Sequence, residues 1–146
     1  MVLGLGKLKE KLSGAISKFS GRKDFLEAVC AATALVASAD GSVTDDEVVA
    51  TTKSVTSNPT LTSAFKTKDI EVCIDTMLKR AQSGRAGRAG LYREIEDIKS
   101  DSIMCETVYL CAHDVADADG KMEQREREVL SQIASKLGVS PSIANV

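Results

Sequence analysis

A segment of twelve residues occurs twice in this chain, and it constrains the fold more than any other feature. VASADGSVTDDE runs from Val36 to Glu47, and VADADGKMEQRE runs from Val115 to Glu126, with six identities. In each copy, apolar residues precede an Ala-Asp-Gly turn, and an acidic stretch typical of a helix N-terminus follows it. The repeat predicts a duplicated helix–acidic turn–helix unit.

Apolar residues along the rest of the chain fall three and four positions apart, which is the period of an amphipathic helix. The strict alternation of a half-buried strand does not occur, so we expect an all-α fold. Two copies are too few for an open repeat array, which favours a compact bundle of about seven helices. The expected helix limits are about Lys23 to Ala39, Thr44 towards Val55, a helix opened by Asp101 and Ser102, and a last helix that stops at Gly138.

A chain of 146 residues is long enough for one core, so we expect a single domain, residues 1–146. Residues 1–20 predict a basic amphipathic helix that packs on the protein's own core or on a partner, with membrane contact at most peripheral. No run of about 20 apolar residues and no signal-peptide pattern is present. We therefore expect a soluble, cytoplasmic protein.

Nucleic-acid binding is disfavoured by the net charge of −2. The basic stretch 79–93 contains one aromatic residue, Tyr92, and therefore lacks platforms on which bases could stack. Ser83, Gly84, Gly87 and Gly90 predict a solvated loop and a helix start there.

Catalysis also has little support in the sequence. The four cysteines form no Cys-x-x-Cys pair and lie in apolar helical patterns, which predicts buried, reduced thiols. A zinc site at Cys111 and His113 would need two further ligands of suitable spacing. His113 is the only histidine, and no motif marks a nucleophile beside it. We expect no enzyme activity and no small-molecule substrate.

The acidic turns have the Asp-Gly-x5-Glu skeleton of a calcium-binding EF-hand loop, yet both copies have valine where that loop begins with an acid. A standard EF-hand is therefore disfavoured, whereas another oxygen-ligand site for a divalent cation, with calcium as the leading ion, stays open. The candidate metal ligands are Asp40, Glu47, Asp117, Asp119 and Glu126.

Helix capping is the competing interpretation of these acids. Thr44 to Glu47 fits the capping box Ser/Thr-x-x-Glu, so Glu47 can close a helix terminus without any metal. In the second copy Glu123 replaces the threonine and is a poor cap, so capping explains Glu126 less well. The second turn, from Asp117 to Glu126, is therefore the first place to look for a cation.

The basic amphipathic start and the paired Ala-Asp-Gly turns near residues 40 and 119 resemble the tellurite-resistance TerB family over nearly the whole chain. The resemblance implies a bundle of about seven helices, a cytoplasmic location and a role in tellurite and stress resistance or phage defence. It also implies membrane-bound TerC-type partners. The family's proposed metal-binding acids correspond here to Asp40, Glu47, Asp119 and Glu126, with Asp46 and Asp117 beside them. Ser38 departs from the acid at Asp117, so the two turns are not fully equivalent.

Two functional hypotheses follow. The first is a noncatalytic interaction module that binds a divalent cation and docks to a membrane-associated partner. The second is a structural or assembly protein, such as a stress-complex or virion component, whose acidic turns only cap helices.

Overall fold

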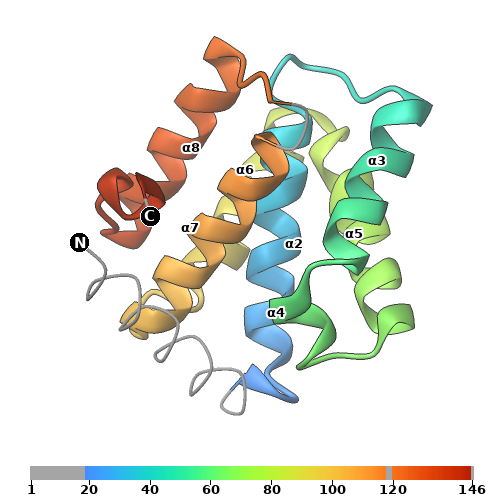
Figure 1. Ribbon diagram of the computed structural model, residues 1–146. Helices are drawn as coiled ribbons and strands as arrows, with labels where there is room; N and C mark the ends of the chain where they lie inside the picture. Colours follow the sequence, from blue (N-terminus) through green and yellow to red (C-terminus); the bar gives the residue numbers. More distant parts are fainter. Residues whose placement is uncertain (1–18, 118–119, 146) are drawn as a thin grey trace.

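The computed structural model describes residues 19–117 and 120–145 of the chain. Within these ranges it contains seven α-helices and one short 3₁₀ helix, and no strand. The elements are α2 (Lys23–Ala37), α3 (Asp45–Thr56), α4 (Pro59–Thr62), α5 (Thr67–Ala81), α6 (Gly84–Glu96), α7 (Ser102–Ala116), α8 (Gln124–Leu137) and η1 (Pro141–Asn145) (Figure 1). The all-α bundle expected from the sequence is confirmed, and the expected helix 1–20 lies almost wholly outside the described residues.

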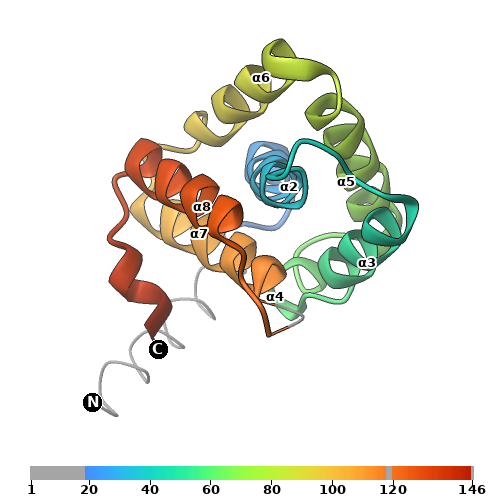
Figure 2. The same cartoon turned by 90° about the horizontal axis from the view of Figure 1, so that it is seen from above.

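Helix α2 lies in the middle of the bundle, and the other long helices surround it (Figure 2). Every residue from Ala28 to Val36 is buried. A helix that is apolar all round is stable only inside a protein, which explains why this one became the centre. Its five alanines at positions 28, 31, 32, 34 and 37 have small side chains, which allow neighbouring helices to approach closely.

Aromatic residues close the core at the N-terminal end of α2. The rings of Phe19 and Phe25 stack with centroids 4.1 Å apart, and Phe65 stacks on Phe25 at 6.3 Å. Phe25 is 0% exposed. This cluster connects α2 to the segment between α4 and α5, because Phe65 lies in that segment.

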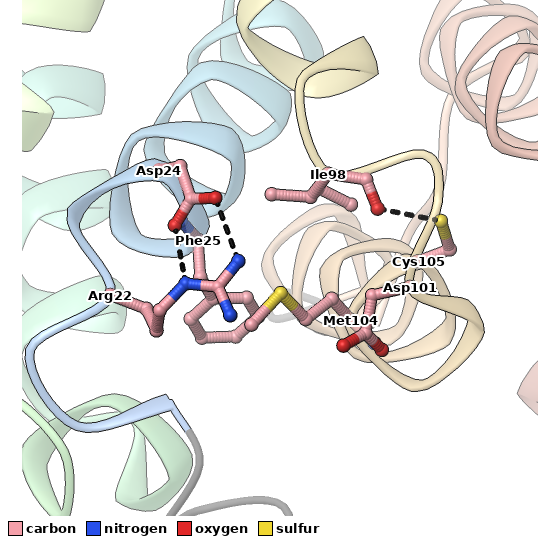
Figure 3. Close-up of polar contacts among 7 residues, drawn as sticks. All are labelled: Arg22, Asp24, Phe25, Ile98, Asp101, Met104 and Cys105. Atoms are coloured by element: carbon pink, nitrogen blue, oxygen red, sulfur yellow. Dashed lines mark hydrogen bonds and ion pairs between the residues drawn. The ribbon is translucent and has the colours of Figure 1, made fainter.

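Several polar contacts lie at the same end of the bundle (Figure 3). The Arg22 guanidinium donates two hydrogen bonds to the Asp24 carboxylate, at 3.1 and 2.9 Å. Asp101 caps α7 by accepting from the backbone N–H groups of residues 103 and 104, each at 3.1 Å. The expected helix start at Asp101 and Ser102 is thus confirmed. The Cys105 thiol donates to the carbonyl of Ile98 at 3.5 Å.

The helix start predicted in the glycine-rich stretch is confirmed at Gly84, but the solvated loop predicted there was wrong, because Gly84, Gly87 and Gly90 are all helical. These glycines form the first two turns of α6, which packs on α5. A Cβ atom at Gly87 would lie 2.0 Å from the backbone oxygen of Arg80, and one at Gly90 would lie 2.9 Å from Nη2 of Arg80. Glycine is therefore used here for close helix packing, which outweighs its low helix propensity.

Other boundaries agree closely with the sequence. Helix α2 ends at Ala37 instead of Ala39, and α3 begins one residue after Thr44. Gly138 ends α8 in the left-handed conformation, with φ of 67°. None of the helices among the described residues is long and apolar enough to cross a membrane.

Candidate site at the paired acidic turns

The two repeated turns have the same backbone design. In the first, the Gly41 N–H donates to the Ser38 carbonyl at 2.9 Å, and in the second, the Gly120 N–H donates to the Asp117 carbonyl at 3.0 Å. Gly41 has φ of 95° and Gly120 has φ of 75°, values that residues with a Cβ atom rarely adopt. The sequence identity of the two glycines therefore has a direct conformational cause.

The fold places both turns at one end of the bundle, opposite the end at which α2 begins (Figure 1). Arg125 of the second copy donates a hydrogen bond from Nη1 to the backbone carbonyl of Asp40 in the first copy, at 3.2 Å. A small hollow of about 180 Å³ lies between the copies. We call it the turn-end hollow; it is lined by Val36, Ala37, Glu47, Ala50, Thr51, Ser54, Val115, Ala116 and Glu126.

Three matched pairs of residues therefore meet in the turn-end hollow: the valines, the alanines and the glutamates of the repeat. Sequence alone could not say whether the turns form one site or two. The structure brings Glu47 and Glu126 to the same hollow, although their helices start 79 residues apart.

Glu47 closes a complete capping box on α3. Its Oε1 accepts from the Thr44 backbone N–H at 3.2 Å and from the Thr44 hydroxyl at 2.9 Å. The Thr44 Oγ1 accepts in return from the Glu47 N–H at 3.2 Å. The capping interpretation of Glu47 is thus confirmed.

Glu126 also caps its helix, contrary to the expectation that capping explains it less well. Its Oε1 accepts from the backbone N–H of Glu123 at 2.9 Å. This half of a capping box needs only a backbone donor at the N-cap position, so replacing threonine by glutamate does not remove it. The poor side chain at position 123 was therefore no argument against a capping role.

The aspartates have different surroundings. Asp40 is exposed, and its Oδ1 accepts from the Ser42 backbone N–H at 3.1 Å, which stabilises the turn locally. Asp117 is exposed at the C-terminal end of α7, whereas its counterpart Ser38 is buried and donates to the carbonyl of Ala34 at 2.9 Å. The two turns thus differ at this position, as the sequence predicted. Asp119 lies outside the described residues.

Among residues 19–117 and 120–145, no group of three or more His, Cys, Asp or Glu side chains could hold a metal ion. Asp119 lies outside these ranges, so the five candidate metal ligands stay a prediction.

A second, more open hollow of about 630 Å³ lies beside the second turn, between α7, α8 and η1. Tyr109, His113, Asp117 and Arg127 are among its lining residues. His113 packs its ring against that of Tyr109, with centroids 6.0 Å apart. Burial raises the pKa of Asp114, one residue along α7, while His113 lowers it and Asp117 raises it.

Arg125 is the residue at this end that sequence reasoning missed. It occupies the position equivalent to Asp46 in the first copy, and this exchange of an acid for a base was the available signal. Its contact with the Asp40 carbonyl could not be foreseen, because that contact depends on how the two repeats pack.

Fold and site together define a helical domain built on two repeated acidic turns that meet at one end. The chain belongs to the family of tellurite resistance protein TerB, whose model matches residues 26–145. This match begins within α2 and ends in η1, so it includes both turns. No curated protein and no solved structure matches the chain.

Proposed function

We propose that this TerB-family chain is a noncatalytic interaction module that binds a divalent cation, calcium foremost, at its paired acidic turns. The observation that carries the proposal is the shared hollow into which both repeats bring their glutamates, Glu47 and Glu126. Binding would couple the two halves of the duplicated unit, since each half supplies part of one ligand set.

Capping and cation binding are compatible for such glutamates. A carboxylate has two oxygens and about four lone-pair positions. Glu47 makes both of its described hydrogen bonds through Oε1, so the cap leaves Oε2 for another ligand. Calcium accepts six to eight oxygen ligands in flexible geometry, including waters, and so tolerates a site assembled from two turns. Asp40, Asp117 and Asp119 complete the proposed ligand set with Glu126.

The proposed partner is a membrane-associated protein of the TerC type, bound from the cytoplasmic side. Helix α3, which begins at the first turn, presents Val49 with 66% of its surface exposed. Cation binding would neutralise carboxylates at the N-terminal end of this helix and so reduce the cost of desolvating them at an interface. The docking would thus depend on the cation, as expected of a stress-response module.

A structural or assembly protein is the alternative, and one observation favours it. Both glutamates already have a structural role, since each accepts a hydrogen bond from its N-cap backbone N–H. Under this alternative the acidic turns stabilise α3 and α8, and no cation is needed.

Glutamate-to-glutamine substitution separates the two functions. Glutamine also closes a capping box, so Glu47→Gln and Glu126→Gln keep the cap but remove the ligand charge. Calcium would be titrated into the full chain while the amide resonances of Gly41 and Gly120 are followed. The cation proposal expects saturable shifts in the wild type, and at least about tenfold weaker binding in each variant. Glu71→Gln on the exposed face of α5 is the matched control and should bind normally.

Absence of any shift at millimolar calcium, or equal binding by all variants, would overturn the cation proposal and favour the structural alternative. Partner docking has a separate test. The detergent-solubilised TerC-type protein should bind the wild type more tightly with calcium than with a chelator, and Glu126→Gln should abolish that difference.

A further inference from the structure

Two of the four cysteines meet across the interface between α2 and α5. Cys73 on α5 places its Sγ 3.9 Å from the carbonyl of Leu26, one turn before Cys30 on α2. Cys30 and Cys73 are close enough for a hydrogen bond between the two thiols to shift the pKa of each. These residues are 43 positions apart in the sequence, which offers no motif that would pair them.

One member of the pair is accessible and the other is not. Cys30 is 0% exposed, whereas Cys73 is half-buried and lines a largely apolar groove of about 630 Å³ between α2 and α5. The expectation that all the thiols are buried was therefore wrong for Cys73. A small reagent can reach the Cys73 sulfur from the groove, whereas Cys30 does not line the groove and is closed off from solvent.

The environment also distinguishes the two sulfurs. The hydrogen bond from Cys30 lowers the pKa of the Cys73 thiol more than burial raises it, and Lys23 lowers it slightly further against Glu27 and Glu94. The same hydrogen bond and burial raise the pKa of Cys30 well above its ordinary value. Cys73 is thus the first of the pair to become a thiolate, which is the nucleophilic form.

The remaining cysteines provide an internal comparison. Burial raises the pKa of Cys111 to about 12, and burial also raises the pKa of Cys105. Both are buried, and Cys105 donates to a backbone carbonyl instead of to another thiol. Neither has the combination of an accessible sulfur and a second thiol in contact.

We propose that Cys30 and Cys73 form a redox-active dithiol that hydroperoxides oxidise to a disulfide joining α2 to α5 beneath the groove. In the first step, the Cys73 thiolate attacks the hydroperoxide, the O–O bond breaks, and the products after protonation are a Cys73 sulfenic acid and an alcohol or water. In the second step, the Cys30 sulfur displaces the hydroxyl group from Cys73, which gives the disulfide and water. The two thiols lose two electrons and two protons in total, and the peroxide accepts the electrons.

Hydrogen peroxide added to the folded full chain provides the test. Intact mass should fall by about 2 Da, the loss of two hydrogens. Trypsin places Cys30 in the peptide 24–53, Cys73 in 69–79, and both other cysteines together in 100–121. Oxidation should therefore yield a linked 24–53/69–79 species that reduction with dithiothreitol removes. Iodoacetamide at neutral pH should label Cys73 at least about tenfold faster than Cys105 or Cys111.

Cys73→Ser should abolish the linked species, and Cys105→Ser should leave it unchanged. Cys30→Ala should stop the reaction at the sulfenic acid, which dimedone traps on peptide 69–79. If Cys30→Ala does not fold, Cys73→Ser and the labelling rates still decide the question. A linked species that forms only in denaturant, or a Cys73 no faster than Cys105, would overturn the proposal and leave the pair as a packing contact.

Discussion

Replacement of Gly87 by alanine should destabilise the bundle, although alanine is the better helix former. Gly87 lies in the first turn of α6 against α5. The new Cβ would lie 2.0 Å from the Arg80 backbone oxygen and 3.2 Å from its carbonyl carbon. The neighbour is main chain within a helix, so a side-chain rotation cannot relieve the overlap. Helix α6 would have to move away from α5.

The expected cost follows from two opposing terms. Alanine gains about 1 kcal/mol over glycine in a helix interior. Ordinary Cβ contacts are longer than 3.4 Å, so the helices must separate by more than 1 Å at this point, as in strongly overpacked cores. Such overpacking costs about 1–3 kcal/mol and occasionally more. The displacement also loosens Leu91 and Ile95, which are 0% exposed, so we expect a net loss of about 1–3 kcal/mol.

Gly90→Ala is the matched control, because it adds the same methyl group to the same helix. Its Cβ would lie 2.9 Å from Nη2 of Arg80, the far end of a flexible side chain that can shift. The change in unfolding free energy should therefore lie within about 1 kcal/mol of zero. Urea unfolding followed by circular dichroism measures both variants. Equal stabilities of the two variants, or a Gly87→Ala protein more stable than the wild type, would refute the packing argument.

Other variants test the caps, the core and the ion pair by the same urea unfolding. Thr44→Ala removes the N-cap hydroxyl of α3 and should cost about 1 kcal/mol without changing any charge, whereas Glu47→Gln should cost less than about 0.5 kcal/mol. Phe25→Ala empties a fully buried, doubly stacked ring position and should cost about 3–5 kcal/mol. The hydrogen bonds from Arg22 hold the pKa of Asp24 below its ordinary value, so the stabilisation is present at neutral pH and is lost as the pH falls through that lowered pKa. Asp24→Asn should therefore lower stability slightly at pH 7 and make no difference in strong acid.

Local signals in the sequence were enough to predict the helices. Asp101 is a good N-cap and Gly138 a good C-terminal stop, and both residues have these roles in the structure. The run around Ala31 and Ala32 was apolar all round, which predicted burial but not that this helix would be the centre of the bundle. Centrality is a property of packing between helices, and no local pattern contains it.

The wrong predictions have two physical causes. Some depend on a contact with another helix, and one depends on a backbone group instead of a side chain. The glycine-rich composition around Gly87 indicates a loop. In the structure, glycine is needed there because the carbonyl of Arg80 on the neighbouring helix leaves no room for a Cβ atom. The sequence predicted Cys73 to be an ordinary buried thiol, because the sequence does not show that the fold brings Cys30 close to it. For Glu126, the expectation considered the side chain at position 123, whereas the hydrogen bond uses that residue's backbone N–H.

The identities between the two repeats now divide by physical role. The glycines are required by positive φ, the valines and the alanine pair Ala37 and Ala116 line the turn-end hollow, and the glutamates cap α3 and α8. Asp40 is left with the weakest structural requirement, because its carboxylate accepts one local hydrogen bond, from the Ser42 backbone N–H, which asparagine can also accept. Asp40→Asn should therefore leave stability nearly unchanged, within about 0.5 kcal/mol. If the same variant weakens calcium binding as strongly as Glu47→Gln, Asp40 is a ligand of the cation. If calcium binding is unchanged, Asp40 is no ligand, and Glu47 is then the only proposed ligand from the first copy.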